Sequence, residues 1–288
     1  MNDQSMLPAP LSRFVIHELV LRALAEDLGR GAVPTDACVP RDISGCAVLA
    51  AREPLVIAGL SVFAEVFSSV DPQVKVELLA QDGALLSKSN LAARVRGPAH
   101  AILKGERVAL NFVQRMSGIA TTTRRFVDAL PRGTRTRIVD TRKTTPGLRA
   151  FERYSVRCGG GHNHRDDLSS AVLIKDNHIA ACGGIRHAIE RTRAHAPHTS
   201  RIECEVDSME QLHEAIEAHA DIVLLDNFDD ATLKEAVAFV AGRAIIEVSG
   251  GVTLDRIPRI AEAGVDVISI GGLTHSARAV DWGLDWEG

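Results

Sequence analysis

Four short apolar runs recur along the second half of the chain: IECEV (202–206), IVLLD (222–226), AIIEV (244–248) and DVISI (266–270). From Glu205 to Asp226 is 21 residues, and the next two intervals, to Val248 and to Ile270, are 22 residues each. Such a spacing accommodates one strand, a crossover helix and the two connections between them. The runs are apolar at consecutive positions, as is typical of parallel strands covered on both faces. The pattern therefore predicts repeated βα units.

Two earlier runs, RIVD (137–140) and VLIK (172–175), bring the number of predicted strands to six. Amphipathic stretches between the runs predict helices at 185–195, 208–218, 230–240 and 253–263. A doubly wound sheet and a barrel both fit this alternation, and six strands fall short of the eight in a complete barrel.

The first part of the chain has a different pattern, which predicts mixed α and β structure. Apolar residues at helical spacing predict a helix over 11–28 that ends at Gly29. Residues 46–51 and 74–79 are predicted strands, and Asp82-Gly83 is a turn signal. Residues 106–130 predict one long helix that is broken or bent near Gly118.

Composition places the chain among globular proteins. Of its 288 residues 45% are hydrophobic and 24% are charged, which excludes wholesale disorder. Because no apolar run approaches 18 residues, no membrane span is expected. The N-terminus does not have the pattern of a signal peptide. The five cysteines form no CxxC pair, which argues against a disulfide framework or a zinc knuckle and favours a reducing, cytoplasmic location.

Positive charge is concentrated in one segment. Residues 101–175 carry 15 Lys and Arg against 6 Asp and Glu, although the whole chain has a net charge of −4. This contrast suggests an anionic ligand bound at a defined place. A solvated basic helix face is the alternative that composition alone favours, and a nucleic-acid surface is a third, made less attractive by the lack of interleaved aromatic residues.

Polar groups follow the predicted strands, where parallel α/β folds bind their ligands. A single charged strand end would be interpreted as an ion pair or a helix cap, but several in register indicate a site. These strand ends are Asp140, Lys175, Glu205, Asp226 and the two glycine turns Ser249-Gly250-Gly251 and Gly271-Gly272.

The residue types at this edge predict an anionic substrate that includes a phosphate. Glu205 and Asp226 suit an Mg²⁺ ion that carries a polyphosphate. The backbone N–H groups of the glycine turns could cradle a phosphate. Cationic side chains would hold carboxylates or phosphates, and the candidates are Arg142, Lys143, His164, Arg165 and Lys175.

The segment GGGHNHR (159–165) also suggests a metal site, because His162 and His164 form a His-x-His pair. Arg165 directly beside His164 would repel a dication, and the three glycines suggest a close backbone approach or a mobile loop. Cys158 is a candidate nucleophile, but without a local base partner a buried structural thiol is favoured.

Several motifs together resemble the quinolinate phosphoribosyltransferase family, also called nicotinate-nucleotide pyrophosphorylase (carboxylating). They are VDTRKTTPGLR (139–149), CGGGHNHR (158–165) followed ten residues later by Lys175, IECEVDSMEQ (202–211), IVLLDNF (222–228), IIEVSGGV (245–252) and VISIGGLTHS (267–276). The resemblance runs from about Leu19 to His275 and includes AEDLG (25–29). It fails at GRGAVPTDAC (29–38), where the family usually has a Gly-Asp-x-Thr-Thr run, and Gly272 is often Ala in the family.

The resemblance implies an N-terminal α/β sandwich domain over 1–115 and an incomplete, about six-stranded α/β barrel over 116–276, with the tail 277–288 a candidate to pack on the first domain. It implies the conversion of quinolinate and phosphoribosyl pyrophosphate, with Mg²⁺, to nicotinate mononucleotide, pyrophosphate and CO₂ in de novo NAD synthesis. It also implies a homodimer with shared active sites, with a higher oligomer as a further candidate, and neither nucleic acid nor membrane as a partner.

The resemblance assigns roles to particular residues. Catalysis would fall to Lys143, Lys175, Glu205 and Asp226, and Mg²⁺ would be held with the pyrophosphate by Glu205 and Asp226. Arg107 would come from the neighbouring subunit. The substrate-binding positions are Arg107, Thr141, Arg142, Lys143, His164, Arg165, Lys175, Glu205, Asp226, Ser249, Gly250, Gly251, Ile270, Gly271 and Gly272.

Three other functions are kept as alternatives. The first is a relative that acts on another base, such as the pyrophosphorylase-like proteins associated with molybdenum transport, although a base with a single carboxylate would not need so many cations. The second is a metal-dependent hydrolase built on His162 and His164. The third is a nucleic-acid-binding module that uses the basic segment.

Overall fold

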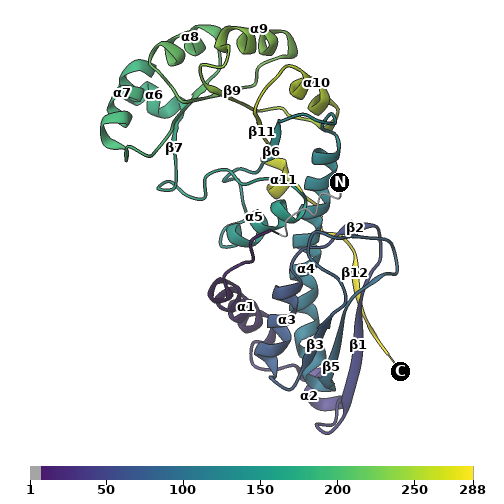
Figure 1. Ribbon diagram of the computed structural model, residues 1–288. Coiled ribbons are helices and arrows are strands. Elements are labelled where there is room, and N and C mark those ends of the chain that lie inside the picture. The colour runs from purple at the N-terminus through teal and green to yellow at the C-terminus, as the bar shows by residue number, and fades with distance from the viewer. Residues whose placement is uncertain (1–7, 288) are drawn as a thin grey trace. The chain divides into compact units, whose positions relative to one another are not determined.

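The structure is a computed structural model that describes residues 8–287, and it divides into two compact units that are interleaved along the chain (Figure 1). The first unit contains the residues up to Arg124, Thr144–Gly160 and the residues from Leu273 onward; the second contains Arg125–Lys143 and Gly161–Gly272. The expected boundary between residues 115 and 116 falls inside the long helix α4 (Ala99–Asp128).

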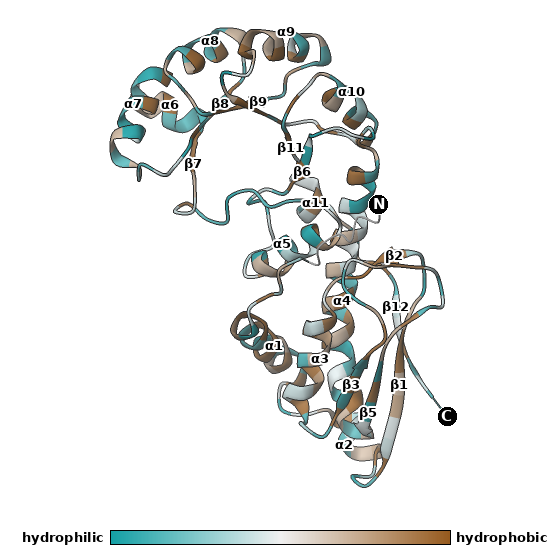
Figure 2. Cartoon of the chain, in the orientation of Figure 1, coloured by the Kyte–Doolittle hydropathy of each residue, from teal (hydrophilic) through white to brown (hydrophobic). Residues whose placement is uncertain are grey.

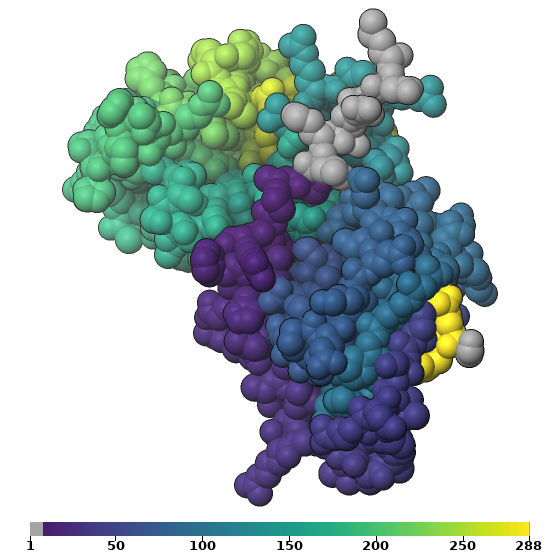
Figure 3. All heavy atoms as spheres, turned by 60° about the horizontal axis from the view of Figure 1, so that its bottom comes forward, coloured from purple at the N-terminus to yellow at the C-terminus, as the bar shows by residue number. Residues whose placement is uncertain are grey.

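The first unit contains a four-stranded antiparallel sheet with the order β12-β1-β5-β3, and a small pair, β2-β4. Its strands are β1 (Ser44–Ala51), β2 (Leu55–Val56), β3 (Lys75–Leu78), β4 (Leu85–Leu86), β5 (Leu91–Pro98) and β12 (Trp282–Trp286). Its helices are α1 (Arg13–Leu28), α2 (Val33–Cys38), α3 (Leu60–Val70), most of α4, and α5 (Arg149–Cys158). The C-terminal strand β12 pairs with β1, and Figure 3 shows it in yellow at the surface of this unit.

Local sequence patterns predict only part of this unit. The expected helix over 11–28, the strands near 46–51 and 74–79 and the turn at 82–83 are all present. Helices α2 and α3 and strands β2, β4 and β5 were not expected. The sequence of α3, LSVFAEVFSSV, is rich in residues that favour strands, and it is helical because its apolar side chains are buried against the core. Residues 33–38, where the chain departs from the family motif, form α2.

Helix α4 runs without interruption through Gly118, so the expected break is absent. A Cβ atom at Gly118 would lie 2.0 Å from the backbone oxygen of Arg278. The glycine is therefore explained by a close approach between the helix and the C-terminal segment, which leaves no room for a side chain.

Two polar contacts tie the segment 144–160 to the rest of the first unit. The Tyr154 hydroxyl donates to Asp82 over 2.7 Å, and Asp82 also accepts the backbone N–H groups of Gly59 and Leu60 at the start of α3. Glu152, which is 1% exposed, is paired with Arg115 on α4 at 2.7 Å. These contacts explain why this segment folds with the first unit although 125–143, just before it, folds with the second.

The second unit is a six-stranded parallel sheet with the order β6-β11-β10-β9-β8-β7. Its strands are β6 (Arg137–Val139), β7 (Val172–Ile174), β8 (Ile202–Val206), β9 (Ile222–Asp226), β10 (Ile245–Ser249) and β11 (Val267–Ser269). The accompanying helices are α6 (Asp176–Cys182), α7 (Ile185–His195), α8 (Met209–Glu217), α9 (Asp230–Val240), the 3₁₀ turn Leu254–Arg256 and α10 (Ile257–Glu262). The short helix α11 (Gly272–His275) begins at the last residue of this unit and continues in the first. All six predicted strands and all four predicted helices are confirmed, and because β6 and β7 stand at opposite ends of the order, the barrel is not closed.

The two faces of this sheet have different side chains. On β8, Cys204 and Val206 are buried toward α7–α10, which lie along the outer side of the strands in Figure 1. Glu203 and Glu205, which alternate with Cys204 and Val206 along the strand, project to the inner side, since successive side chains of a strand point to opposite faces. Figure 2 shows brown apolar residues along the strands and teal residues toward the outside of the helices. Because Glu203 and Glu205 face it, the inner side of the sheet is polar, an arrangement suited to a ligand-binding site.

None of the helices within residues 8–287 is long and apolar enough to cross a lipid bilayer.

Two glycines of α4 give a test of the packing. Replacing either with Ala should gain about 1 kcal/mol of helix propensity. At Gly118 the new Cβ meets backbone, whereas at Gly105 it meets the Phe67 ring at 2.9 Å, which can shift. We expect Gly118→Ala to lower the urea midpoint well below that of the parent and Gly105→Ala to change it much less. Equal midpoints for the two variants would contradict the close approach of Arg278.

Candidate active site

Polar side chains gather at the carboxyl ends of the second unit's strands. Asp226 and Ser249 end β9 and β10 and lie side by side in the sheet register. Glu205 lies on the same inner side of β8, and its carboxylate forms an ion pair with Lys175, which directly follows β7. The structure therefore brings Lys175, Glu205, Asp226 and Ser249 to one edge of the sheet, as the regular spacing of the runs predicts.

The loop after β6 brings further cations to this unit. Arg142 is half-buried, and Lys143 is exposed with its backbone N–H held by the Thr141 hydroxyl at 3.1 Å. Burial and the positive charge of Arg142 both lower the pKa of Arg165, while the charge of Glu203 raises it. Two guanidinium groups that remain charged and repel each other form a region in which an anion would be stabilised.

Asp140 has a structural role. It is fully buried, and its two carboxylate oxygens accept from the Asn163 side chain at 2.5 Å and from the backbone N–H of His164 at 2.7 Å. The backbone of His162 runs alongside Val139 and extends the sheet there. Asp140 thus fixes the loop that carries His164 and Arg165, and it does so with both of its oxygens.

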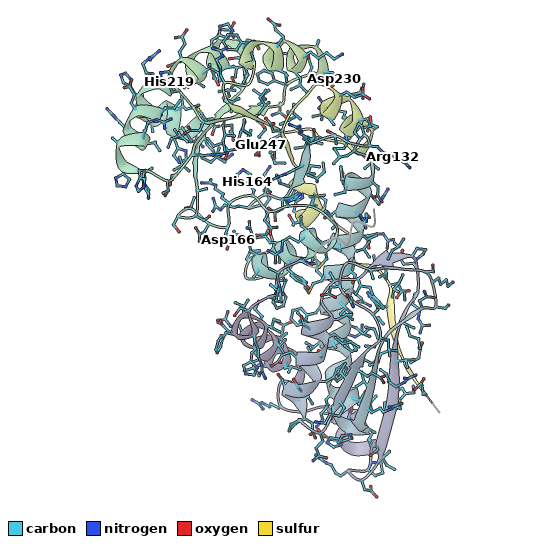
Figure 4. The ribbon with its side chains drawn as sticks, viewed as in Figure 1. Arg132, His164, Asp166, His219, Asp230 and Glu247 are labelled. Atoms are coloured by element: carbon cyan, nitrogen blue, oxygen red, sulfur yellow. The ribbon has the colours of Figure 1, made fainter. Side chains whose placement is uncertain are left out.

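His164 lies between two buried carboxylates that the sequence reasoning missed. Its Nε2 atom is 3.4 Å from Glu203 and 3.4 Å from Glu247. The two glutamates come from β8 and β10 and are 3% and 4% exposed. Figure 4 shows His164 and Glu247 on the inner side of the sheet. Burial and the charge of Glu247 raise the pKa of Glu203, and the hydrogen bond from His164 opposes that rise.

The charge of the His164 ring follows from two competing contacts. The backbone N–H of Arg165 points at Nδ1 over 2.7 Å, a contact that favours a neutral ring. Burial also lowers the pKa of His164, but Glu203 and Glu247 outweigh it and raise the pKa from 6.5 to about 10. The two glutamates therefore favour the charged ring, whereas the Arg165 N–H donates to Nδ1 as it would to a neutral one.

The same cluster is where a metal ion could be considered. Among residues 8–287, His164, Glu203 and Glu247 are the one set of three candidate ligand side chains whose donor atoms all lie within 4.8 Å of one another. Coordination through Nε2 would require that atom to lose the proton it shares with the carboxylates. His162 is exposed and outside the cluster. The donor set fits an internal ion pair better than it fits zinc, which weakens the hydrolase alternative.

The turns after β9 and β10 interlock. A Cβ at Gly250 would lie 2.2 Å from the side-chain oxygen of Asn227, and both residues have positive φ, 80° and 60°. Asn227 donates its backbone N–H to Ser249 at 3.0 Å and its side-chain amide to Asp226 at 2.8 Å. Arg256 lies against the Gly251 oxygen at 3.4 Å and beside an open cavity of about 420 Å³. These contacts fix the turn for which a phosphate cradle is predicted.

The remaining predicted positions lie as follows. Ile270 is buried, and Gly271 and Gly272 follow it after β11 in the second unit. Arg107 is exposed on α4 and belongs to the first unit, so it is not grouped with the other cations.

Cys158 is buried in the first unit, and burial and the charge of Asp82 raise the pKa of its thiol, which fits a structural rather than a nucleophilic cysteine.

Four residues of this region were not predicted: Glu203, Glu247, Asn227 and Arg256. Glu203 and Glu247 had a signal, since a carboxylate inside an apolar parallel strand requires a partner. Asn227 follows a strand directly, where asparagine tolerates positive φ. The position of Arg256 has no comparable signal in the sequence, because its partners Asp230 and the Phe228 carbonyl come from another loop.

Comparison with known proteins places these features in a wider context. Family models match the chain over most of its length: the N-terminal domain of quinolinate phosphoribosyl transferase over residues 33–117 and the C-terminal domain over residues 119–285. A probable nicotinate-nucleotide pyrophosphorylase (carboxylating) from Bacillus subtilis is 42% identical over 275 residues, 96% of this chain and 94% of its own length. The nicotinate-nucleotide pyrophosphorylase (carboxylating) from Mycobacterium leprae is 44% identical over 276 residues, 93% and 96% of the two chains.

Solved structures agree with these matches. NadC from Streptococcus pyogenes superposes with a TM-score of 0.92 at 40% identity, covering 97% of this chain and 100% of its own. The nicotinate-nucleotide pyrophosphorylase from Francisella tularensis gives 0.91 at 35% identity, covering 99% of this chain and 100% of its own. The mixed α/β fold with its six-stranded parallel sheet is thus shared with these proteins.

The charge of His164 predicts a dependence of stability on pH. Below pH 6.5 both the folded and the unfolded ring are protonated, and the ion pairs contribute fully. Between pH 6.5 and about 10 only the folded protein holds the proton, so the free energy of unfolding should fall as pH rises. Urea titrations should show a steeper fall for the parent than for His164→Gln, with His187→Gln, an exposed histidine, as control. Parallel curves for parent and His164→Gln would contradict a charged ring.

Proposed function

The chain belongs to the quinolinate phosphoribosyltransferase family, and we propose that it transfers the phosphoribosyl group of phosphoribosyl pyrophosphate to quinolinate, yielding nicotinate mononucleotide, pyrophosphate and CO₂. It is a decarboxylating pentosyltransferase of NAD biosynthesis.

The observation that carries this proposal is the group of cations at residues 142, 164 and 165 of the second unit. Quinolinate has two adjacent carboxylates, so its binding requires several positive charges at close range. Arg142, Arg165 and the His164 ring supply them, and Arg165 and Arg142 already repel each other. A base with one carboxylate would not need so many cations, which makes a relative acting on another base the weaker candidate.

The strand ends would bind the second substrate. Ser249, Gly250 and Gly251, with Ile270, Gly271 and Gly272, would surround the 5′-phosphate. Lys143 and Lys175 would contact the phosphate groups. Glu205 and Asp226 would face the ribose hydroxyls and the pyrophosphate. Their half-buried carboxylates are hard oxygen donors of the kind Mg²⁺ prefers, and the ion would neutralise charge on the pyrophosphate as it leaves.

In the proposed reaction the ring nitrogen of quinolinate attacks the anomeric carbon while the C–O bond to pyrophosphate breaks. The carboxylate next to the now cationic ring nitrogen is then lost as CO₂. Its electron pair stays on the ring carbon, where the adjacent positive nitrogen stabilises it, and a proton takes the place of CO₂. Positioning and charge neutralisation account for such catalysis, and no covalent nucleophile is needed.

Arg107 supports the proposal of a shared site. It is exposed on α4 in the first unit, whereas every other predicted site residue lies in the second. We propose that two copies form a homodimer in which Arg107 serves the neighbouring subunit's site, with a larger assembly as an extension. The cytoplasm is proposed as its location; plant relatives are named as chloroplastic or mitochondrial.

A direct assay tests the function. With quinolinate, phosphoribosyl pyrophosphate and Mg²⁺ the protein should form nicotinate mononucleotide, and chelation of Mg²⁺ should stop it. Arg165→Lys should lower kcat/KM for quinolinate about a hundredfold, or roughly 3 kcal/mol, because an ammonium keeps the charge but cannot reproduce the two parallel hydrogen bonds of a guanidinium. The control Arg186→Lys changes an exposed arginine of α7 and should leave the rate unchanged. Equal use of nicotinate and quinolinate would contradict the assigned substrate.

Subunit mixing tests the shared site. Arg107→Ala and Lys175→Ala should each be inactive alone. After exchange about half of the dimers are mixed, and each mixed dimer has one site free of both changes, so activity should recover to about a quarter of the parent's. If no activity returns although exchange is demonstrated and both variants are folded, Arg107 does not serve the partner's site.

A further inference from the structure

One side chain, Arg256, joins the turn after β10 to the loop after β9. It belongs to the 3₁₀ turn Leu254–Arg256 and is partly buried. Its guanidinium donates to the Asp230 carboxylate over 2.8 Å, to the Phe228 backbone oxygen over 3.1 Å and to the Gly251 backbone oxygen over 3.4 Å. The first two contacts fix the guanidinium at the start of α9, and the third connects it to the glycine turn. The planar fork of an arginine can serve several acceptors at once in this way.

The turn that Arg256 contacts has backbone donors to offer. Gly250 and Gly251 have φ of 80° and 57°, both in the left-handed region. Gly251 is exposed and Gly250 is partly so. Within residues 8–287, neither N–H group has an acceptor in hydrogen-bond distance. Two successive N–H groups of this kind suit a phosphate. Because they make no hydrogen bonds of their own, the shape of the turn depends on contacts with the neighbouring loop.

The carboxylates beside the turn are already engaged. Asp229 and Asp230 line the same open cavity as Arg256 and Arg259. Asp229 accepts two backbone N–H groups in the first turn of α9, at 3.1 and 2.8 Å. Asp230 is paired with Arg256 at 2.8 Å and with Arg259 at 3.2 Å. The negative charge of both side chains is therefore compensated locally, which favours an anion at the turn.

We propose that Arg256 is a positioning residue for the 5′-phosphate of phosphoribosyl pyrophosphate. It keeps the Gly250-Gly251 turn in the shape that its two N–H groups need to bind the phosphate, so that the substrate does not have to order the turn. This inference rests on the proposed function, in which the turn is part of the phosphate cradle. Arg256 acts through its contacts with the two backbone oxygens and Asp230, and its charge does not need to touch the phosphate. Donors held in place before binding stabilise an anion better than mobile ones.

Arg256→Ala should raise the KM for phosphoribosyl pyrophosphate about tenfold, because binding must then order the turn, and it should leave the KM for quinolinate unchanged. Arg256→Lys should recover only part of the loss, since one ammonium cannot serve all three acceptors. Arg259→Ala is the matched control and should change either KM much less. Arg259 pairs with Asp230 and Asp255 but, in the described part of the chain, with neither of the two backbone oxygens. A lower urea midpoint for Arg256→Ala with unchanged KM values would reduce the role of Arg256 to stability and overturn the proposal.

A change at Asp230 distinguishes positioning from direct contact with the phosphate. In Asp230→Ala the guanidinium of Arg256 loses one of its anchors, so the KM for phosphoribosyl pyrophosphate should rise as it does in Arg256→Ala. If Arg256 instead bound the phosphate through its charge, removal of the neighbouring carboxylate would strengthen that contact and lower the KM. A lower KM would therefore contradict the positioning role. The Arg259→Ala control measures what the loss of the second ion pair of Asp230 contributes.

Binding of ribose 5-phosphate gives a readout that needs no turnover. Calorimetry should show that this sugar phosphate binds the parent and Arg259→Ala similarly and binds Arg256→Ala about tenfold more weakly. Equal affinity for the parent and Arg256→Ala, or no binding to the parent, would overturn the proposal. If the parent makes no nicotinate mononucleotide but the affinities differ as expected, the proposed function fails and the role of Arg256 in phosphate binding stands.

Discussion

Two negative charges in the middle of a parallel sheet constrain the rest of the second unit. Glu203 and Glu247 occupy inward-facing positions of β8 and β10, where burial strongly disfavours an unpaired carboxylate. His164 pairs with both, which requires the loop 161–165 to lie across the inner side of the sheet. Asp140 holds that loop at the end of β6. One electrostatic requirement thus determines where the loop runs and where the next residue, Arg165, is placed.

The alternation of strands and helices was predictable because it is a local property. Buried parallel strands are largely apolar, so the apolar runs predicted all six strands of the second unit, and crossover helices of nearly constant length gave the last four runs their regular spacing. The first unit was harder to predict. Helix α3 has the composition of a strand, and α2 and β5 lacked a pattern that was recognised; their form depends on burial against residues far away in the sequence.

Some residues of the candidate site could likewise be predicted from local sequence, and others could not. Residues at the strand ends, such as Lys175, Glu205 and Asp226, could be located because the ends of parallel strands share one edge. His164 and Arg165 were candidates because of their possible positive charge, and the resemblance to the family added Arg107. Neither argument identified Arg256, which joins two loops through backbone carbonyls, or the partnership of His164 with Glu203 and Glu247, because such contacts form only when separate segments meet. The interleaved path of the chain was not predicted either, because it depends on contacts such as the ion pair between Arg115 and Glu152, which are 37 residues apart in the sequence.

The interleaved path has a consequence for synthesis of the protein on the ribosome. Strand β12 completes one edge of the first unit's sheet, and it contains residues 282–286. All strands of the second unit precede residue 270 in the sequence. The sheet of the first unit therefore lacks one strand when every strand of the second unit has been synthesised. Until residues 282–286 are available, β1 has one edge unpaired, and an unpaired edge is a site for wrong pairing.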